Sequence, residues 1–204
     1  MPEAPITGGA VRAHYGEPSA RAKAKQLVWL DGHARAFIGL SPFLVIASSD
    51  AGGRGDATPR GDAPGFVAVL DDATLLVPDR PGNRRVDTML NVAENPGVGL
   101  LFLVPGINET LRVNGHARFT MDADLLRPFG AHGKDPVAGL LVDVEEVYFH
   151  CGKALIRSRL WDQEAKVERS CFPSLGRILA DQVAGTDLGE SERSIEEGYR
   201  TKLY

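Results

Sequence analysis

The sequence predicts a mainly β protein, a small β-barrel with peripheral helices. About six segments have the composition or the alternation of strands, and hairpin turns join many of them. Single helical segments lie between some strands, but the regular β-α-β alternation of a doubly wound sheet is missing. Neither G-x-G-x-x-G after a strand nor G-x-x-x-x-G-K-[ST] occurs, which excludes the two commonest phosphate-binding loops.

Composition and charge narrow the class of protein further. The chain has 204 residues, of which 43% are apolar and 25% charged, as in an ordinary globular protein. Its net charge of −4 argues against a general nucleic-acid binder, which usually has a broad basic face. No apolar run approaches the ~20 residues that span a bilayer. The N-terminus lacks the pattern of a signal peptide. We therefore expect a cytoplasmic protein with no membrane or nucleic-acid partner.

The N-terminal segments are expected to be an arm followed by helices. Residues 1–18 have the composition of an irregular, flexible arm. Residues 19–30 predict a helix, with Ser19 as its N-cap. Residues 33–41 predict a second short helix, because their apolar residues fall roughly on one side.

Four strands are expected next, each bounded by turn residues. The compact apolar run 43–49 predicts a buried strand. Residues 57–60 and 65–70 predict two strands with a Gly/Pro break between them. The Asp-Asp turn at 71–72 then joins 65–70 to the strand 74–78 in a hairpin.

The second half alternates strands with short helices. Residues 86–95 carry apolar side chains at helical spacing, and Asn95-Pro96 ends the pattern. Strands are expected at 97–106, 109–120 and 139–151, and a capped helix at 122–130.

The last third predicts a different organisation. Residues 174–185 and 191–203 have the patterns of short surface helices. The expected organisation is therefore an arm at 1–18, a barrel domain at 19–160, and a C-terminal helical extension at 161–204 packed on the barrel or on a dimer.

The segment LLVPDRPGNRRVDTML, residues 75–90, gathers three arginines where a strand leads into a helix. A helix start presents free N–H groups and a positive dipole end, and arginine adds a planar fork of donors that matches a phosphate. Gly82 would let a ligand approach the backbone, and Asn83 could cap the helix. The alternative is a solvated turn in which the arginines pair with Asp79 or Asp87.

Two further segments carry polar residues inside strands. ATPRGDAPGF places Arg60 on the strand before the hairpin. In NETLRVNG, alternation places Thr110, Arg112 and Asn114 on one face. That face could contact a polar ligand or could be the solvated outside of a barrel.

Taken in order, the segments TPRGD, LLVPDRPGNRR, NVAENPGVGLLFLVPG and ETLRVNGHA resemble the FMN-binding split barrel of the pyridoxamine 5′-phosphate oxidase-like family. The resemblance covers about residues 40–155, and the order of the segments makes it specific. It implies a Greek-key-like split barrel, FMN as cofactor, and a homodimer with FMN at the subunit interface.

The resemblance also implies site residues. In the family, a small polar residue and two basic ones hold the FMN phosphate, a pattern that Asn83, Arg84 and Arg85 match. Strands of the same subunit are implied to contact the cofactor through Thr58, Arg60, Gly61, Val77, Pro78, Thr110 and Arg112. A closing strand of the second subunit, VYFHCGKALIRS, is implied to contact it through His150, Lys153, Arg157 and Ser158.

The chain also departs from the family's namesake. The arginine–x–histidine pair that recognises pyridoxamine phosphate has no counterpart, because residues 156–160 read IRSRL. The resemblance is therefore to a relative that shares the cofactor site rather than to the oxidase itself.

Two classes of function follow from the resemblance. The first is an FMN-dependent oxidoreductase that passes a hydride through FMN N5 to or from a small molecule, with Arg60 or Lys153 stabilising reduced flavin near N1. The second is a non-catalytic flavin- or haem-binding module for sensing, storage or tetrapyrrole degradation. The sequence shows no Ser/His/Asp or Cys/His set and no metal-binding motif, so no catalytic residue or metal ligand is assigned. A nucleic-acid-binding barrel is disfavoured, since only 7% of residues are aromatic.

Overall fold

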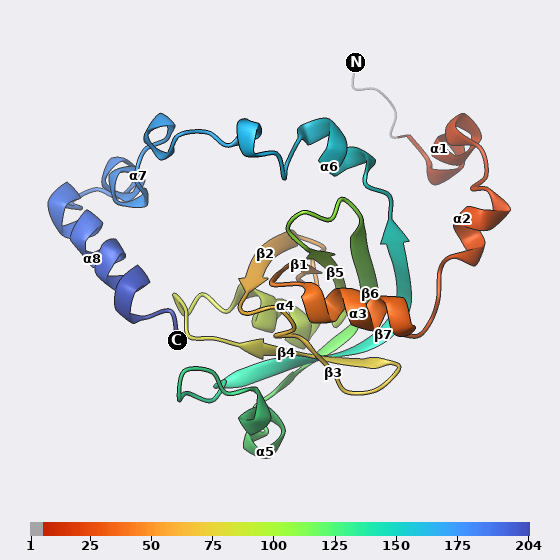
Figure 1. Cartoon of the computed structure of the whole chain (residues 1–204), viewed down its shortest axis with the longest axis horizontal. Helices are drawn as coiled ribbons and strands as arrows, with labels where there is room; N and C mark the ends of the chain where they lie inside the picture. Colours follow the sequence, from red (N-terminus) through yellow and green to blue (C-terminus); the bar gives the residue numbers. More distant parts are fainter. Residues whose placement is uncertain (1–5) are drawn as a thin grey trace.

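Seven antiparallel strands form one sheet in the computed structural model, which describes residues 6–204. The strand order is β2-β1-β5-β6-β7-β4-β3, and the sheet curls on itself (Figure 1). The strands are β1 (Phe43–Ser49), β2 (Gly55–Gly61), β3 (Ala68–Val69), β4 (Thr74–Asp79), β5 (Gly97–Leu103), β6 (Thr110–Thr120) and β7 (Ala138–His150). Among the described residues no ladder joins the edge strands β2 and β3, so the sheet is a split barrel that does not close.

Helices cover the sheet and extend beyond it. The α-helices are α1 (Gly8–Tyr15), α2 (Ala20–Ala24), α3 (Gly32–Leu40), α4 (Asp87–Glu94), α5 (Ala123–Leu126), α6 (Lys153–Ser158), α7 (Leu175–Gln182) and α8 (Leu188–Thr201). Three 3₁₀ turns are η1 (Arg127–Phe129), η2 (Gln163–Ala165) and η3 (Arg169–Cys171). None of the helices in residues 6–204 is long and apolar enough to cross a membrane.

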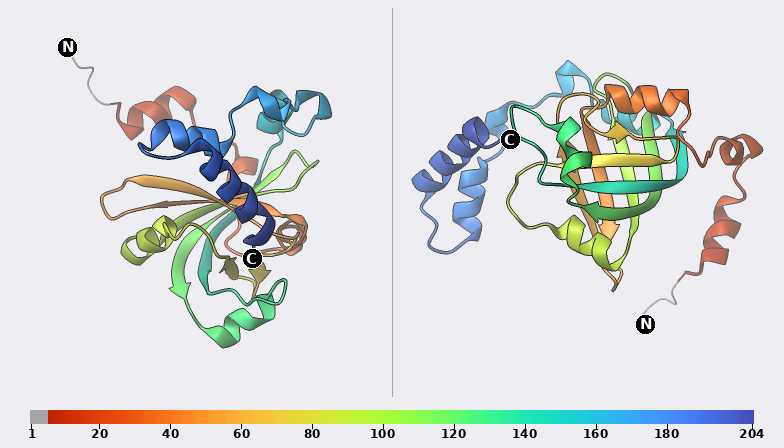
Figure 2. Two further views of the ribbon diagram at one scale, coloured as in Figure 1. Left: turned by 90° about the vertical axis from the view of Figure 1, so that its left-hand side faces the viewer. Right: turned by 90° about the horizontal axis from the view of Figure 1, so that it is seen from below.

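The core fills the inside of the curled sheet. Alternate residues of the central strands point inward and are fully buried, for example Leu44 on β1, Phe102 on β5 and Leu111 on β6. Helix α3 adds Phe37 and Ile38 to the same cluster. Helices α3 and α4 lie on opposite sides of the barrel in the right-hand view of Figure 2.

The two ends of the chain project from the barrel as arms. Helices α1 and α2 lie on one side of the sheet, and α7 and α8 lie on the other (Figure 1). Helices α7 and α8 pack closely, since a Cβ on Gly176 would come within 2.6 Å of Glu192 Cγ. Neither α1 nor α2 contains a buried residue.

Expected N-terminal elements differ from the structure in two places. Residues 8–15 of the arm form helix α1, with Thr7 as its N-cap, whereas residues 1–5 lie outside the described residues. The helix expected at 19–30 stops at Ala24, because Leu27 is drawn into a β-bridge with Val147.

Two later segments also differ. The strand expected at 65–70 shrinks to the two residues of β3, since Gly65 has φ +79° and the Phe66 N–H closes a turn to Ala63 O. The segment 147–158, taken by resemblance as one closing strand, leaves the sheet after His150 and continues as helix α6.

Candidate functional site

The loop between β4 and α4 has an unusual backbone. Arg84 and Val86 have φ values of +62° and +51°, a region that non-glycine residues rarely adopt. The Asn83 side chain accepts a hydrogen bond from the Arg85 N–H at 3.1 Å, and Val86 precedes α4 without a side-chain cap. The N–H groups at the start of α4 are therefore left without a side-chain acceptor.

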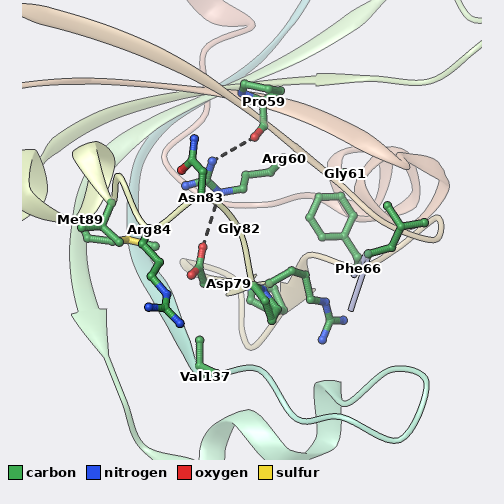
Figure 3. A pocket seen from close by; sticks show the side chains of 15 residues that line it. Pro59, Arg60, Gly61, Phe66, Asp79, Gly82, Asn83, Arg84, Met89 and Val137 are labelled. Carbon is green, nitrogen blue, oxygen red and sulfur yellow. Dashed lines mark hydrogen bonds and ion pairs between the residues drawn. The ribbon is translucent and has the colours of Figure 1, made fainter. Parts of the chain in front are cut away.

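This loop forms one side of a cavity of about 640 Å³, which we call the arginine cavity. Its size falls within the range of small-molecule and cofactor sites. Figure 3 shows residues of β2 on one side and of the β4–α4 loop on the other. The lining residues are Pro59, Arg60, Gly61, Phe66, Pro78, Asp79, Arg80, Pro81, Gly82, Asn83, Arg84, Val86, Met89, Val137 and Leu203.

Two of the three arginines in the cavity are neutralised by carboxylates. Arg60 Nε lies 3.9 Å from Asp79 Oδ1, and its Nη1 donates to Thr58 Oγ1 at 2.8 Å (Figure 3 shows the Asp79 pair). Arg80 Nε donates to Asp62 Oδ2 at 2.8 Å, with both side chains largely buried. Arg80 therefore pairs with Asp62 rather than with Asp79 or Asp87, the partners considered from the sequence.

Arg84 differs from the other two. It forms no ion pair with any carboxylate in residues 6–204, and its side chain is exposed in the cavity. The cavity therefore has one uncompensated positive charge, and that charge lies on the loop that precedes α4. A bound anion would be drawn to this point.

Burial affects the two carboxylates of the cavity rim differently. Burial raises the pKa of Asp79, and the nearby Arg60 only partly opposes it. Burial would also raise the pKa of Asp62, but hydrogen bonds from the Ala63 N–H, the Tyr204 hydroxyl and Arg80 outweigh it. The Asp62 pKa therefore lies below its usual range, and Asp62 stays charged.

The edge of β4 is open beside the cavity. The short strand β3 pairs only with Leu75 and Leu76, so the β4 backbone beyond them has no partner on that side in the described residues. Val77 buries its side chain in the core, and Pro78 lines the cavity and lacks an N–H. An extended backbone edge of this kind can lie along a flat ligand without competition from a neighbouring strand.

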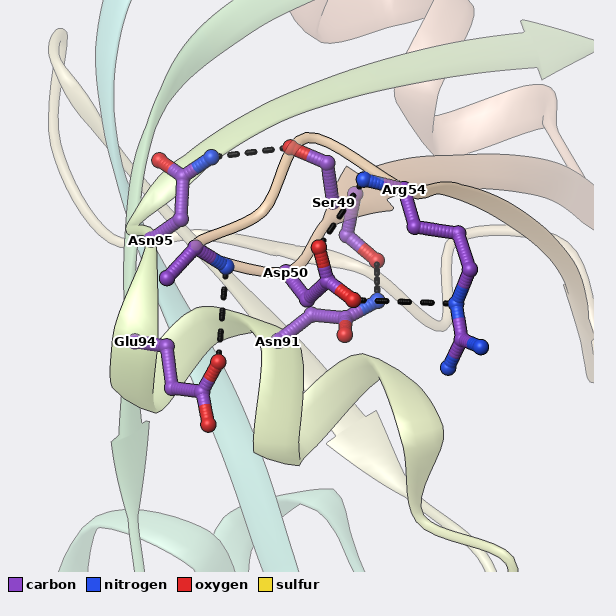
Figure 4. A network of polar contacts seen from close by, with 8 residues as sticks. Ser49, Asp50, Arg54, Asn91, Glu94 and Asn95 are labelled. Atoms are coloured by element: carbon purple, nitrogen blue, oxygen red, sulfur yellow. Dashed lines mark hydrogen bonds and ion pairs between the residues drawn. The ribbon is translucent and has the colours of Figure 1, made fainter.

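Helix α4 is fixed to the turn between β1 and β2 by polar contacts (Figure 4). Asn91 Nδ2 donates to Ser48 Oγ at 3.0 Å, and Asn95 Nδ2 donates to Ser49 Oγ at 2.8 Å. The Ala51 N–H donates to Glu94 Oε2 at 3.3 Å. These contacts hold the helix, and with it the preceding loop, against the strand that leads into β2.

A second cavity of about 410 Å³ lies on the outer face of the sheet, and we call it the β6 cavity. Thr110, Arg112 and Asn114 line it together, as alternation predicts. Arg112 Nη1 donates to Tyr148 Oη at 2.6 Å. Apolar residues of β1 and β5 complete its walls, together with His150 at the end of β7, Cys151 after it, and Ala154 and Leu155 of α6.

The structure thus divides the predicted site residues into separate groups. Arg60, Gly61, Pro78, Asn83 and Arg84 line the arginine cavity, with Thr58 and Val77 beside them. Thr110, Arg112 and His150 line the β6 cavity, which shares no lining residue with the first.

Besides Thr58 and Val77, four predicted residues line neither cavity. Arg85 lines a separate pocket of about 430 Å³, where its Nε donates to Asp87 Oδ2 at 2.8 Å. Lys153, Arg157 and Ser158 are exposed on helix α6, and Ser158 Oγ donates to Leu155 O.

Several residues of the arginine cavity were not singled out from the sequence. Asp79 was considered only as an ion-pair partner, although it follows Pro78 on the strand edge and its carboxylate enters the cavity. Phe66 comes from the loop before β3, Met89 from α4, Val137 from the loop before β7, and Leu203 from beyond α8. No local pattern connects these segments, so only the tertiary structure brings them together.

Comparisons with solved structures give low similarity. A variant of HupZ from Group A Streptococcus is 16% identical with a TM-score of 0.49, covering 59% of this chain and 99% of that one. A candidate pyridoxamine 5′-phosphate oxidase from Lactobacillus delbrueckii is 22% identical with a TM-score of 0.48, covering 61% and 98%. General Stress Protein 26 from Bacillus anthracis is 16% identical with a TM-score of 0.43, covering 57% and 93%. No curated protein matches the sequence significantly.

The family comparison is more decisive. The family model described as pyridoxamine 5′-phosphate oxidase matches residues 30–151, well over half of the chain. The match begins at the entry to α3 and ends just after β7, so it spans the whole sheet and most of the lining of both cavities. Members of the family typically bind a flavin, and many are dimers. The chain belongs to the pyridoxamine 5′-phosphate oxidase family.

Proposed function

We propose that the protein binds FMN in the arginine cavity and acts as an FMN-dependent oxidoreductase on a small molecule. The observation that carries the proposal is the charge of Arg84, which has no carboxylate partner in residues 6–204 and lies on the loop before α4, next to the open edge of β4. A phosphate monoester carries about −1.5 to −2 charges at neutral pH. An arginine fork and free helix N–H groups are suited to such a group.

The residues present fit the cofactor. The strained Arg84 and Val86 backbone and the Asn83 turn would hold the phosphate, and Arg85 could add a second cation by leaving Asp87. Val77 and Pro78 offer an unpaired strand edge to the ring and the ribityl chain. When bound, FMN supplies hydride transfer at N5.

The protein's own groups would then set the environment of the ring. Thr58 and Asp79 fix the Arg60 guanidinium at the wall of the cavity. A fixed cation here would stabilise negative charge on a neighbouring ligand. Lys153, exposed on α6, is the other candidate for that role and would act from a second subunit.

We further propose a homodimer that brings the two cavities together. The outer face of the sheet near the β6 cavity exposes apolar side chains, including Phe43 and Leu101. If a second copy covers this face, Thr110, Arg112 and His150 of one subunit can complete the arginine cavity of the other. Residues 19–160 would then form the cofactor-binding domain and 161–204 an extension packed on the barrel or on the partner.

A non-catalytic flavin- or haem-binding module is the second candidate. It is favoured by the sequence IRSRL at 156–160, which replaces the substrate-recognising arginine–x–histidine pair. Titration of the purified protein with FMN, monitored by flavin absorbance and fluorescence, tests the first proposal; a protein that takes up none rules it out. Anaerobic addition of NADH or NADPH to the FMN-loaded protein separates the two candidates, because only an enzyme is expected to bleach the flavin rapidly.

A further inference from the structure

The last residues of the chain return to the rim of the arginine cavity. Helix α8 runs toward the barrel and ends at Thr201, and the residues after it reach the loop that follows β4 (Figures 1 and 2). Leu203 lines the cavity together with Phe66 and the β4–α4 loop. Its side chain is 62% exposed, so its own packing does not hold it there.

Tyr204 supplies the attachment. Its hydroxyl donates to Asp62 Oδ1 at 2.8 Å, and the other oxygen of the same carboxylate accepts from Arg80 Nε at 2.8 Å. The Arg80 guanidinium also lies 5.8 Å from the centre of the Tyr204 ring, within the range of a cation–π contact. Tyr204 therefore joins an ion pair whose two side chains are largely buried in the folded chain.

A third rim segment contacts Tyr204 from the other side. The His132 ring lies 4.2 Å from the Tyr204 ring, centre to centre, and Lys134 Nζ donates to the Tyr204 carbonyl oxygen. Val137, which follows in the same loop, lines the cavity. One side chain thus ties together the segments after β2, after β4 and before β7.

We propose that Leu203 and Tyr204 form a latched wall that controls access to the arginine cavity. Tyr204 is the positioning residue that fixes the three rim segments, and Leu203 is the residue that limits what passes between them. The latch itself rests only on the contacts above, whereas its role in cofactor and substrate access rests on the proposed FMN site.

The proposal predicts two effects of opening the latch. In Tyr204→Phe, which loses the hydrogen bond to Asp62, we expect faster amide hydrogen exchange at residues 59–66, 79–86 and 131–137 of the cofactor-free protein. Truncation after Lys202 should increase the same exchange further and should raise the FMN dissociation rate at least tenfold. Leu203→Ala should also raise the FMN dissociation rate, but it should not change amide exchange at residues 131–137. Tyr199→Phe, an exposed tyrosine on α8, is the matched control and should change neither quantity.

The outcomes separate the latch from the FMN proposal. Unchanged exchange in both Tyr204→Phe and the truncated chain overturns the latch, whether or not FMN binds. Faster exchange with an unchanged FMN dissociation rate would contradict the proposal that Leu203 and Tyr204 control access to the arginine cavity. If the wild-type protein takes up no FMN, the proposed function fails, while the exchange measurement still decides whether Tyr204 fixes the rim.

Discussion

At the scale of single residues, the site depends on which arginines are already neutralised. Arg60 and Arg80 have carboxylate partners within the fold, and Arg85 has one outside the cavity, so these side chains need no ligand. Arg84 is exposed in the cavity without such a partner among the described residues. The sequence alone does not show which of these four arginines is available to a ligand. Only their ion pairs in the folded structure distinguish them.

Replacement of Arg84 tests its role directly. A hydrogen bond to a charged group contributes about 1.5–3 kcal/mol, and about 1.4 kcal/mol corresponds to a tenfold change in affinity. Arg84→Ala should therefore raise the FMN dissociation constant about 10- to 100-fold, measured by fluorescence titration. Arg127→Ala removes an exposed arginine outside the cavity that pairs with Asp124 and is the control. Equal affinities for Arg84→Ala and the wild type would remove Arg84 from the site.

Asp79 gives a pH-dependent prediction for the cofactor-free protein. Because burial raises its pKa in the folded state, the folded protein binds this proton more tightly than the unfolded chain does. Asp79 therefore contributes stability at low pH, and this contribution is lost as pH rises through the raised pKa. In Asp79→Asn this loss is absent. The melting temperature of the variant minus that of the wild type should therefore increase as the pH is raised from about 4, the ordinary Asp pKa, to neutrality. A constant difference across that range would show that Asp79 is not perturbed.

At the scale of elements, the loop between β4 and α4 combines strain with anchoring. A β-branched residue with positive φ costs about 1–3 kcal/mol, and such strain persists where the surroundings enforce it. Val86 is in this state, while α4 behind it is held to the β1–β2 turn by Asn91 and Asn95. The loop is thus arranged before any ligand arrives.

Relief of the strain at Val86 should be measurable. The side chain is 49% exposed, so its replacement removes little packing. Asparagine tolerates positive φ, and Val86→Asn should increase the free energy of unfolding by about 1 kcal/mol in urea denaturation. The same change at Val167, which is exposed and lacks a positive φ, should give no gain. Destabilisation at Val86 alone would argue against strain in the loop.

The β6–β7 pair contains a bulge that bends the two longest strands. Asn114 pairs with Glu146 while Gly115 pairs with Val144, so Glu145 is extra. A Cβ on Gly115 would lie 2.1 Å from the Asp143 carbonyl oxygen. Gly115→Ala should therefore destabilise the protein by at least about 2 kcal/mol, measured by urea denaturation. The control is Gly97→Ala on β5, where the nearest atom to the added Cβ is 3.5 Å away and the effect should be small. A small effect at Gly115 would contradict the close approach of the two strands.

Periodicity predicted most elements of the sheet because their local pattern agrees with their burial. The run 43–49 and the alternation at 109–120 gave β1 and β6 nearly residue for residue. Periodicity failed where a long-range contact decides the backbone. Leu27 pairs with Val147 instead of continuing a helix. The extension of the closing strand to residue 158 came from the resemblance and not from periodicity, and residues 153–158 form α6 instead.

At the scale of the whole molecule, the predicted site residues occupy two cavities that do not meet within one chain. The resemblance indicated residues from Thr58 to Ser158, and the fold places most of them in or beside the arginine cavity or on the outer face of the sheet. The proposed site shared between two copies would account for this separation. Sequence order alone cannot reveal it, nor can it reveal that Leu203 and Tyr204 return to the cavity rim.

The central claim is that this chain forms an FMN site, and one titration tests it most directly. Cofactor-free protein at known concentration is titrated with FMN while the flavin fluorescence is recorded. The account predicts saturable binding with one FMN per chain, because each chain provides one arginine cavity and one β6 cavity. A titration that shows no saturable uptake of FMN would contradict it.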